Sequence, residues 1–287
     1  MFGGVIFFLL SLIGVLINAF LLFLFLSDPA FSGDFYKLCV SKTISNLVVL
    51  LTHLLWVAPC SILNSYYISS IDFNLFVSQI GAVSFYFLGG LTQICMASNR
   101  FLITAFPSKI GQQKRTRYSM TMLGISWILA LLSIAACFLA RIAIFYDLHT
   151  LGYQSSDKDH ATTFFATQLI TFLITSAISC SINACTTVNL LKTGVSGLAT
   201  DASMKRRKRN FRLFIQNVFQ DAIPLIDVIN TFAMNFVTGS LFATFSSTFT
   251  LILVHVLDGL TMFIFSWPSW VARKTSVLRV TAASSTH

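Results

Sequence analysis

Residues 73–99, FNLFVSQIGAVSFYFLGGLTQICMASN, decide the fold of this chain because they contain no Asp, Glu, Lys or Arg. An α-helix rises 1.5 Å per residue, so about 20 residues cross the roughly 30 Å hydrocarbon core of a bilayer. The stretch therefore predicts a membrane-spanning helix. It ends at a charged residue, Arg100.

The composition of the whole chain agrees with a membrane protein. Of its 287 residues, 55% are hydrophobic and only 10% are charged, whereas ordinary soluble domains contain about 25% charged residues. A soluble protein with this composition would expose larger apolar patches than a monomer tolerates. We therefore expect most of the surface to face lipid.

Seven stretches of this kind predict seven spans. They cover about residues 5–26, 43–63, 75–103, 118–143, 161–191, 211–237 and 244–267. The sixth is the least apolar because it contains Asp221 and Asp227. Transmembrane β-strands alternate in polarity and give much weaker segments, so a barrel is excluded. The predicted fold class is all-α, with a seven-helix domain over residues 1–267 and a short cytoplasmic tail over residues 268–287.

The distribution of Lys and Arg predicts the orientation. If the amino terminus is outside, 17 of the 19 basic residues lie in inner loops, at inner helix ends or in the tail, and only Arg141 and Lys158 lie outside. This count places Lys42 in the first inner loop. The positive-inside rule then predicts an outer amino terminus and a cytoplasmic carboxyl terminus. The anionic inner leaflet is a sufficient partner for the net charge of +9, without a nucleic acid.

The sequence shows no catalytic or metal-binding motif. It contains no GxSxG, HExxH, GxGxxG or P-loop pattern and no Glu. Of the six cysteines only Cys60 lies near the predicted outer face, which leaves no external disulfide framework. We therefore expect neither an enzyme nor a cofactor or metal site.

Arg100 has two interpretations. It can be an interfacial anchor whose head group reaches water while its stem stays in lipid. Alternatively, rhodopsin-like receptors carry an Asp-Arg-Tyr motif at the inner end of the third helix, where this chain has Asn99-Arg100-Phe101. Because Asn replaces the acid, a resting-state partner of Arg100 would be a carbonyl, a hydroxyl or a more distant acid.

Three longer stretches carry a specific resemblance. They are LCVSKTISNLVVLLTHLLWVAP (38–59), IGAVSFYFLGGLTQICMASNRFLITAFPSK (80–109) and TFTLILVHVLDGLTMFIFSWP (248–268). They resemble the nematode chemoreceptors called serpentine receptor class X, and the resemblance extends over nearly the whole chain. It implies a G-protein-coupled receptor in the plasma membrane of a sensory neuron, at its cilium, that responds to a small-molecule or pheromone-like ligand and activates a heterotrimeric G protein.

The chain departs from the wider rhodopsin-like pattern in two places. The outer disulfide is missing, which leaves the position of the second outer loop open. The seventh span has Asp258 and Gly259 instead of Asn-Pro-x-x-Tyr. The predicted G-protein coupling site comprises Asn99, Arg100, Phe101, Pro107, Lys109, Lys205, Arg206, Arg207, Lys208 and Arg209.

Polar residues inside the predicted spans are candidate functional groups. Four of them lie at comparable depth and predict a polar cluster, which would act as a switch or as interhelical glue: Asn18, Asn46, His255 and Asp258.

The sixth span carries a candidate ligand contact and a candidate hinge. Asp227 lies in the outer half, with Asn230 and Thr231 at helical spacing, and either lines a ligand cavity or is a hydrogen-bonded packing residue. Pro224 removes a backbone hydrogen bond and predicts a kink that could act as a pivot.

Two other functions compete with a signalling receptor. The first is a seven-helix transporter or channel whose cation path is lined by Asp221, Asp227 and Asp258. The second is a receptor that reaches the cell surface poorly, since the chain has no outer disulfide and no N-glycosylation sequon.

Overall fold

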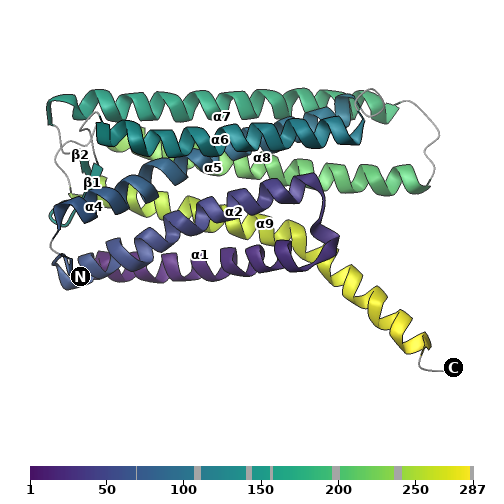
Figure 1. Ribbon diagram of the computed structural model, residues 1–287, viewed down its shortest axis with the longest axis horizontal. Helices are drawn as coiled ribbons and strands as arrows, with labels where there is room; N and C mark the ends of the chain where they lie inside the picture. Colours follow the sequence, from purple (N-terminus) through teal and green to yellow (C-terminus); the bar gives the residue numbers. More distant parts are fainter. Residues whose placement is uncertain are drawn as a thin grey trace.

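A computed structural model of the protein shows a bundle of long helices that run side by side along one axis (Figure 1). The structure describes residues 1–68, 70–106, 111–139, 144–155, 158–195, 201–235 and 241–284. The amino terminus lies at one end of the bundle and the carboxyl terminus at the other (Figure 1).

The first half of the chain forms α1 (Phe2–Ser27), the 3₁₀ turn η1 (Pro29–Phe31), α2 (Asp34–Thr52), the π-helical segment η2 (His53–Val57), α3 (Ala58–Leu63), α4 (Ile71–Ser78), the π-helical segment η3 (Gln79–Ser84), α5 (Phe85–Ala105) and α6 (Gln112–Leu139). The second half forms β1 (Ile144–Asp147), β2 (Gly152–Ser155), α7 (Lys158–Val195), α8 (Asp201–Asn235) and α9 (Leu241–Ser284). The prediction of an all-α bundle is confirmed. The small hairpin β1–β2 was not predicted.

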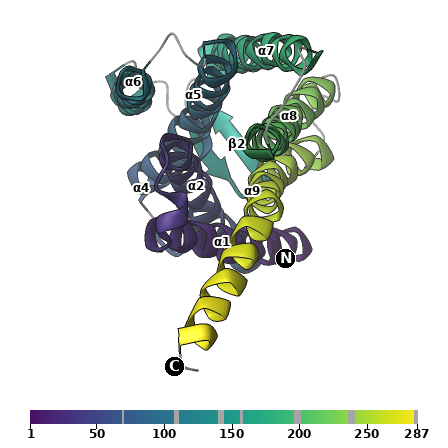
Figure 2. The ribbon, with the colours of Figure 1, turned by 90° about the vertical axis from the view of Figure 1, so that its right-hand side faces the viewer.

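Each predicted span corresponds to one helical column. The second consists of α2, η2 and α3, the third of α4, η3 and α5, and the others of single helices. Seen from one end, α6 stands at the periphery of the bundle (Figure 2). The indole N–H of Trp127 on α6 donates to the Ser41 hydroxyl on α2 at 3.0 Å, which ties this outer helix to the bundle.

The second column contains a proline just after the π-helical turn η2. Pro59 lies in the first turn of α3 and has no backbone N–H, so the Leu55 carbonyl four residues earlier loses its helical donor. The hydroxyl of Tyr67 donates to this carbonyl instead. In lipid a freed carbonyl must find such a partner within the protein.

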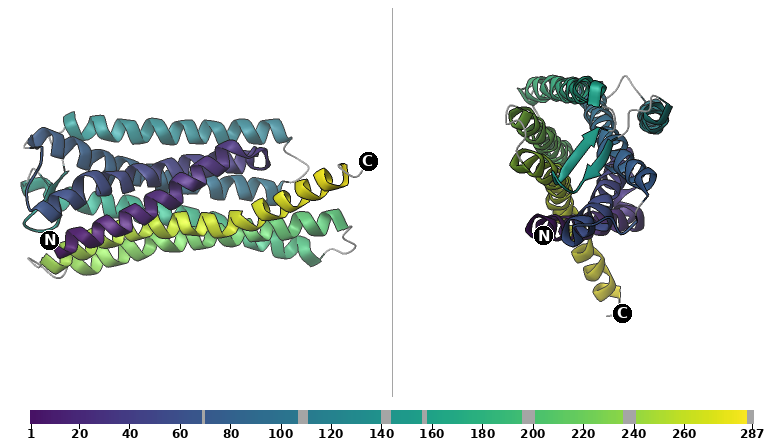
Figure 3. Two further views of the ribbon diagram at one scale, coloured as in Figure 1. Left: turned by 90° about the horizontal axis from the view of Figure 1, so that it is seen from below. Right: turned by 90° about the vertical axis from the view of Figure 1, so that its left-hand side faces the viewer.

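The outer surface of the helices is apolar and the inner surface is more polar. On α1, Leu16 and Phe23 are exposed, whereas Asn18 and Leu21 are fully buried. Helices α1 and α9 run beside each other along the bundle (Figure 3). Exposed apolar side chains of this extent indicate a lipid-facing surface.

Helix α8 differs from the other long helices. Among the described residues, six helical segments are long and apolar enough to cross a bilayer, and α8 is not one of them. It begins with a basic segment, and its buried face is polar, with Asn217, Asp221 and Asp227 inside the bundle. The sequence had likewise indicated that the sixth span is the least apolar. Its polar face is compatible with lipid because it is turned inward.

The hairpin covers one end of the bundle and is held there by hydrogen bonds. Asn74 on α4 donates to the Tyr146 carbonyl at 2.9 Å and accepts from the Tyr146 amide at 3.1 Å. The Tyr146 hydroxyl is bonded to Ser61 at 2.7 Å. Burial raises the pKa of this hydroxyl, so Tyr146 stays neutral in the packed hairpin. These contacts position the loop whose location the missing disulfide had left open.

Helix α9 continues beyond the predicted end of the seventh span. It extends as a helix from Leu241 to Ser284, and its last part projects away from the other helices (Figure 1). The predicted tail therefore begins as a direct extension of the seventh column.

Candidate functional site

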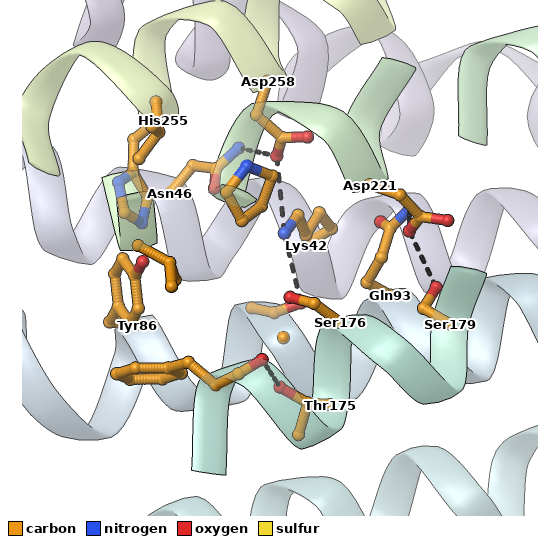
Figure 4. A pocket seen from close by; sticks show the side chains of 16 residues that line it. Lys42, Asn46, Tyr86, Gln93, Thr175, Ser176, Ser179, Asp221, His255 and Asp258 are labelled. Carbon is orange, nitrogen blue, oxygen red and sulfur yellow. Dashed lines mark hydrogen bonds and ion pairs between the residues drawn. The ribbon is translucent and has the colours of Figure 1, made fainter. Parts of the chain in front are cut away.

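A small cavity lies inside the bundle between α2, α5, α7, α8 and α9 (Figure 4). Its volume is about 50 Å³. A buried water occupies about 10–15 Å³ of such volume, so the cavity has room for a few water-sized groups. Its main polar lining consists of Lys42, Asn46, Gln93, Asp221, His255 and Asp258.

Asp258 on α9 is the centre of a polar network. One carboxylate oxygen accepts from Asn46 Nδ2 at 2.7 Å, and the other accepts from Gln220 Nε2 at 2.7 Å. The ammonium of Lys42 lies 3.7 Å from the first oxygen and donates to the Gly89 carbonyl at 3.1 Å. The network therefore joins α2, α5, α8 and α9.

The position of Lys42 corrects the sequence-based prediction, which placed it in an inner loop. Helix α2 begins at Asp34, so Lys42 lies more than two turns inside it and its residue is only 5% exposed. The carboxylate of Asp258 compensates the buried charge. Without such a partner a buried ammonium would be very costly.

Asn18 joins the same network from α1. Its side-chain oxygen accepts from Asn46 Nδ2 at 3.2 Å, and its own amide donates to the Gly14 carbonyl at 2.9 Å. Gly259 leaves the space that Asn18 occupies, because a Cβ at this position would lie 2.4 Å from Asn18 Nδ2. Three of the four residues of the predicted cluster are thus linked by hydrogen bonds.

His255 behaves differently from the other three. Its Nδ1 is bonded to the Leu251 carbonyl of its own helix at 2.7 Å. Its ring lies 5.5 Å from the ring of Tyr86 and lines the cavity. His255 is therefore near the cluster, and its hydrogen bond goes to the backbone.

Asp221 on α8 forms a second network on the opposite wall of the cavity. One of its carboxylate oxygens accepts from Gln93 Nε2 at 2.9 Å and from the Ser179 hydroxyl at 2.7 Å. Asn183 donates to the other oxygen. These bonds connect α8 to α5 and α7.

Asp227 forms a third network, nearer to the hairpin end. The Tyr86 hydroxyl donates to one of its oxygens and the Thr250 hydroxyl to the other, each at 2.7 Å. Asn230 donates to Thr250 at 3.1 Å. The cavity itself touches Asp221 and Pro224 of α8 but not Asp227, Asn230 or Thr231. A ligand contact for those three residues stays a prediction, as does the pivot at Pro224.

Arg100 lies at the end of α5 that faces away from the hairpin. It is 4% exposed, and its guanidinium carbon lies 3.6 Å from the centre of the Phe35 ring on α2. Such a contact between a guanidinium and a ring face is a cation–π interaction. The sequence-based alternatives for a partner of Arg100 had not included an aromatic ring.

The two neighbours of Arg100 in the predicted motif differ in burial. Asn99 is 1% exposed, and its side-chain amide has no hydrogen-bond partner among the described residues. Phe101 is partly exposed, and its ring lies 6.0 Å from that of Phe106.

The remaining residues of the predicted coupling site are only partly within the described chain. Pro107 and Lys109 lie outside the described residues. Lys205, Arg206, Arg207, Lys208 and Arg209 lie in the first turns of α8. The coupling role of the whole set stays a prediction.

Sequence reasoning missed Lys42 and Gln220 as members of the polar core. The spacing of Lys42 and Asn46, four residues apart on one helix, places both side chains on the same face and could have indicated the first. Gln220 directly precedes Asp221, and no feature of the neighbouring sequence indicates that its side chain faces the interior. Its partner Asp258 is 38 residues away.

The chain is similar to known receptors in sequence and in fold. The family described as "Serpentine type 7TM GPCR chemoreceptor Srx" matches residues 8–266. The structure is similar to the crystal structure of squid rhodopsin, with a TM-score of 0.74 and 11% sequence identity, over 91% of this chain and 80% of the squid chain. At this identity the likeness concerns the fold alone. No protein with a curated description matches the chain. Because the family match covers nearly the entire bundle, the chain belongs to the serpentine type 7TM GPCR chemoreceptor family Srx, a family of membrane receptors and not of enzymes.

Proposed function

We propose that this chemoreceptor binds a small molecule from outside the cell in the cavity between α5 and α8, and that binding opens the opposite end of the bundle to a heterotrimeric G protein. The ligand would act by binding the open arrangement more tightly than the closed one, since only differential affinity shifts such an equilibrium.

One observation carries the proposal: α8 both lines the cavity and contains the basic segment. Asp221 and Pro224 of α8 line the cavity, and Arg209 precedes Asp221 by twelve residues on that helix. At 1.5 Å per residue the separation is about 18 Å. A tilt of α8 about Pro224 would therefore move the basic segment when the contacts of Asp221 change.

The polar core supplies contacts that such a movement would break. Gln220 binds Asp258 on α9, and Asp221 binds side chains of α5 and α7. Both residues of α8 face the interior. Their hydrogen bonds would hold α8 in the closed arrangement until a ligand offers replacements.

At the inner end we assign the coupling role to Arg100 with its two neighbours. The guanidinium of Arg100, which stacks on Phe35, is a planar group with five N–H donors. The buried amide of Asn99 has no partner among the described residues and is available to one. We place Pro107, Lys109 and the segment 205–209 around them as a basic surface that attracts the G protein by long-range electrostatics.

The orientation follows from the same assignment. The amino terminus and the hairpin would be outside the cell, and the basic segment would face the anionic inner leaflet of the plasma membrane. Location in a sensory neuron cilium rests on the family alone.

The alternative function, a cation path along Asp221, Asp227 and Asp258, is weakened by Lys42. Its ammonium already lies 3.7 Å from Asp258, inside the same cavity. Asp258 is therefore already compensated and offers no free negative charge to a passing cation.

The decisive experiment is a screen of odorants and pheromone-like molecules on cells that express the receptor with a promiscuous G protein. We expect a ligand that raises calcium only when both proteins are present. Conductance and uptake are recorded in the same cells. A ligand-dependent current or uptake without the G protein would favour the transporter instead.

A further inference from the structure

The cavity contains one more carboxylate than ammonium. Within the part of the chain that the structure describes, Lys42 is paired with Asp258 across it. Asp221, on the opposite wall, is bonded to neutral donors, namely the amides of Gln93 and Asn183 and the hydroxyl of Ser179. If the three charged groups are ionised, the cavity carries one uncompensated negative charge, which is expensive in a medium of low dielectric constant.

Two further oxygen atoms in the wall lack donors. Gln93 Oε1 and Asn46 Oδ1 are buried without a hydrogen-bond partner among the described residues. The residues are 4% and 1% exposed, and both line the cavity (Figure 4). In each case the amide nitrogen is bonded to a carboxylate, which directs the oxygen elsewhere. Unpaired buried acceptors of this kind favour an occupant that brings N–H or O–H groups.

The wall also contains two aromatic side chains. Tyr86 and Phe172 line the cavity and meet edge to face, with their ring centres 4.4 Å apart. Ring faces attract organic cations, particularly at desolvated sites. The wall therefore combines an unpaired negative charge, acceptors without donors and aromatic surface.

We infer that the ligand of this receptor carries a small protonated amine, and that its ammonium group binds Asp221 in the cavity with Gln93 Oε1 as a further acceptor. An ammonium has three donors and one positive charge, so it satisfies the acceptors and neutralises the charge together. The volume of about 50 Å³ admits an amine of only a few heavy atoms. The inference rests on the proposed function, since it names the class of ligand for the same cavity.

Matched pairs of probes test this class directly. The full-length receptor is purified in lipid nanodiscs, and its thermal unfolding is followed with ethylamine against ethanol and with butylamine against 1-butanol. A ligand that binds only the folded state raises the unfolding temperature. We expect each amine to bind at least about 10-fold more tightly than its alcohol, the effect of a charge-assisted hydrogen bond. Equal stabilisation by amine and alcohol, or none by either, would overturn the inference.

Two variants assign the effect to Asp221. Asp221→Asn keeps the shape of the side chain and removes the charge, and it should weaken amine binding about 10- to 100-fold. Asp72→Asn removes an exposed carboxylate on α4, far along the third column from the cavity, and should leave amine binding unchanged. Equal binding by Asp221→Asn and the unchanged receptor would overturn the assignment. If Asp221→Asn does not fold, the amine and alcohol pairs on the unchanged receptor decide.

An inorganic cation is the competing occupant, and the buffer distinguishes it. The titrations are repeated in sodium and in potassium chloride. Stabilisation by sodium alone that requires Asp221 would overturn the inference in favour of a metal-ion site. Because this measurement needs no G protein, its outcome is independent of coupling. A receptor that binds amines without signalling would contradict the proposed function. A receptor that is activated only by neutral molecules would contradict the inference of an amine ligand and leave the proposed function intact.

Discussion

The ammonium of Lys42 on α2 and the carboxylate of Asp258 on α9 lie 3.7 Å apart, with side chains only 6% and 5% exposed. The same carboxylate holds Gln220 of α8, the helix that we propose to move. This pair therefore links α2 and α9 to the helix for which we propose a movement.

Lys42→Met should destabilise the receptor strongly, because it leaves a buried carboxylate without its counter-ion. Breaking one side of a buried ion pair costs about 3–5 kcal/mol. The double variant Lys42→Met/Asp258→Asn removes both charges and keeps an oxygen for Asn46 or Gln220, so it should recover part of that loss. Unfolding of the purified variants measures both. A double variant less stable than Lys42→Met would contradict an ion pair.

Asp258→Asn alone should change basal signalling or ligand potency, because it weakens the bond to Gln220. It should also lower surface expression, because it leaves the buried ammonium of Lys42 without its counter-ion. Asp258→Leu should lower surface expression further, since it leaves buried donors unpaired as well. Cell-surface labelling and a second-messenger assay in the same cells distinguish the two effects. Unchanged signalling and expression in both variants would show that Asp258 is needed for neither signalling nor folding.

Arg100→Lys separates a coupling residue from an anchor. A lysine keeps the charge and reaches the interface equally well, but it lacks the planar fork of five donors. We expect Arg100→Lys and Arg100→Ala to reach the surface and lose most ligand-evoked signalling, whereas single neutralisations in the segment 205–209 reduce it only slightly. A fully active Arg100→Lys receptor at the expression level of the unchanged protein would identify an anchor.

Asn74→Ala should loosen the β1–β2 hairpin. The side chain bonds both backbone groups of Tyr146 and accepts from the Trp56 indole at 3.0 Å. Each buried group left unpaired costs about 1–3 kcal/mol. Hydrogen exchange of the Tyr146 amide should therefore become faster than in the control Asp72→Ala on the same helix. Equal protection in both variants would show that packing alone holds the hairpin.

Gly259→Ala should be destabilising although alanine is the better helix former. Its Cβ would meet the side chain of Asn18 at 2.4 Å, and overpacking of this kind costs about 1–3 kcal/mol. Gly124 on α6 is the matched control, because a Cβ there meets nothing within 4 Å. Gly124→Ala should raise or preserve the unfolding temperature. A similar change in both variants would mean that Asn18 can move aside.

The amino-acid sequence by itself determined the helical class, the approximate position of seven columns and the family. Partition into lipid depends on the local density of apolar groups, so stretches such as residues 73–99 can be recognised as membrane spans without knowledge of the helices that pack against them. The motif Asn99-Arg100-Phe101 is equally local, because it lies within one helical turn.

Only the tertiary structure decided which polar groups meet. Asn46 and Asp258 are 212 positions apart in the chain, and the sequence placed them at similar depth but could not identify Lys42 as the cation between their helices. The inward direction of Asp221 depends on how α8 is rotated against α5. Asp227 also faces inward, but its carboxylate is bonded to Tyr86 and Thr250 and does not line the cavity. Rotation and pairing are set by packing between helices, where a buried charge is stable only beside its partner.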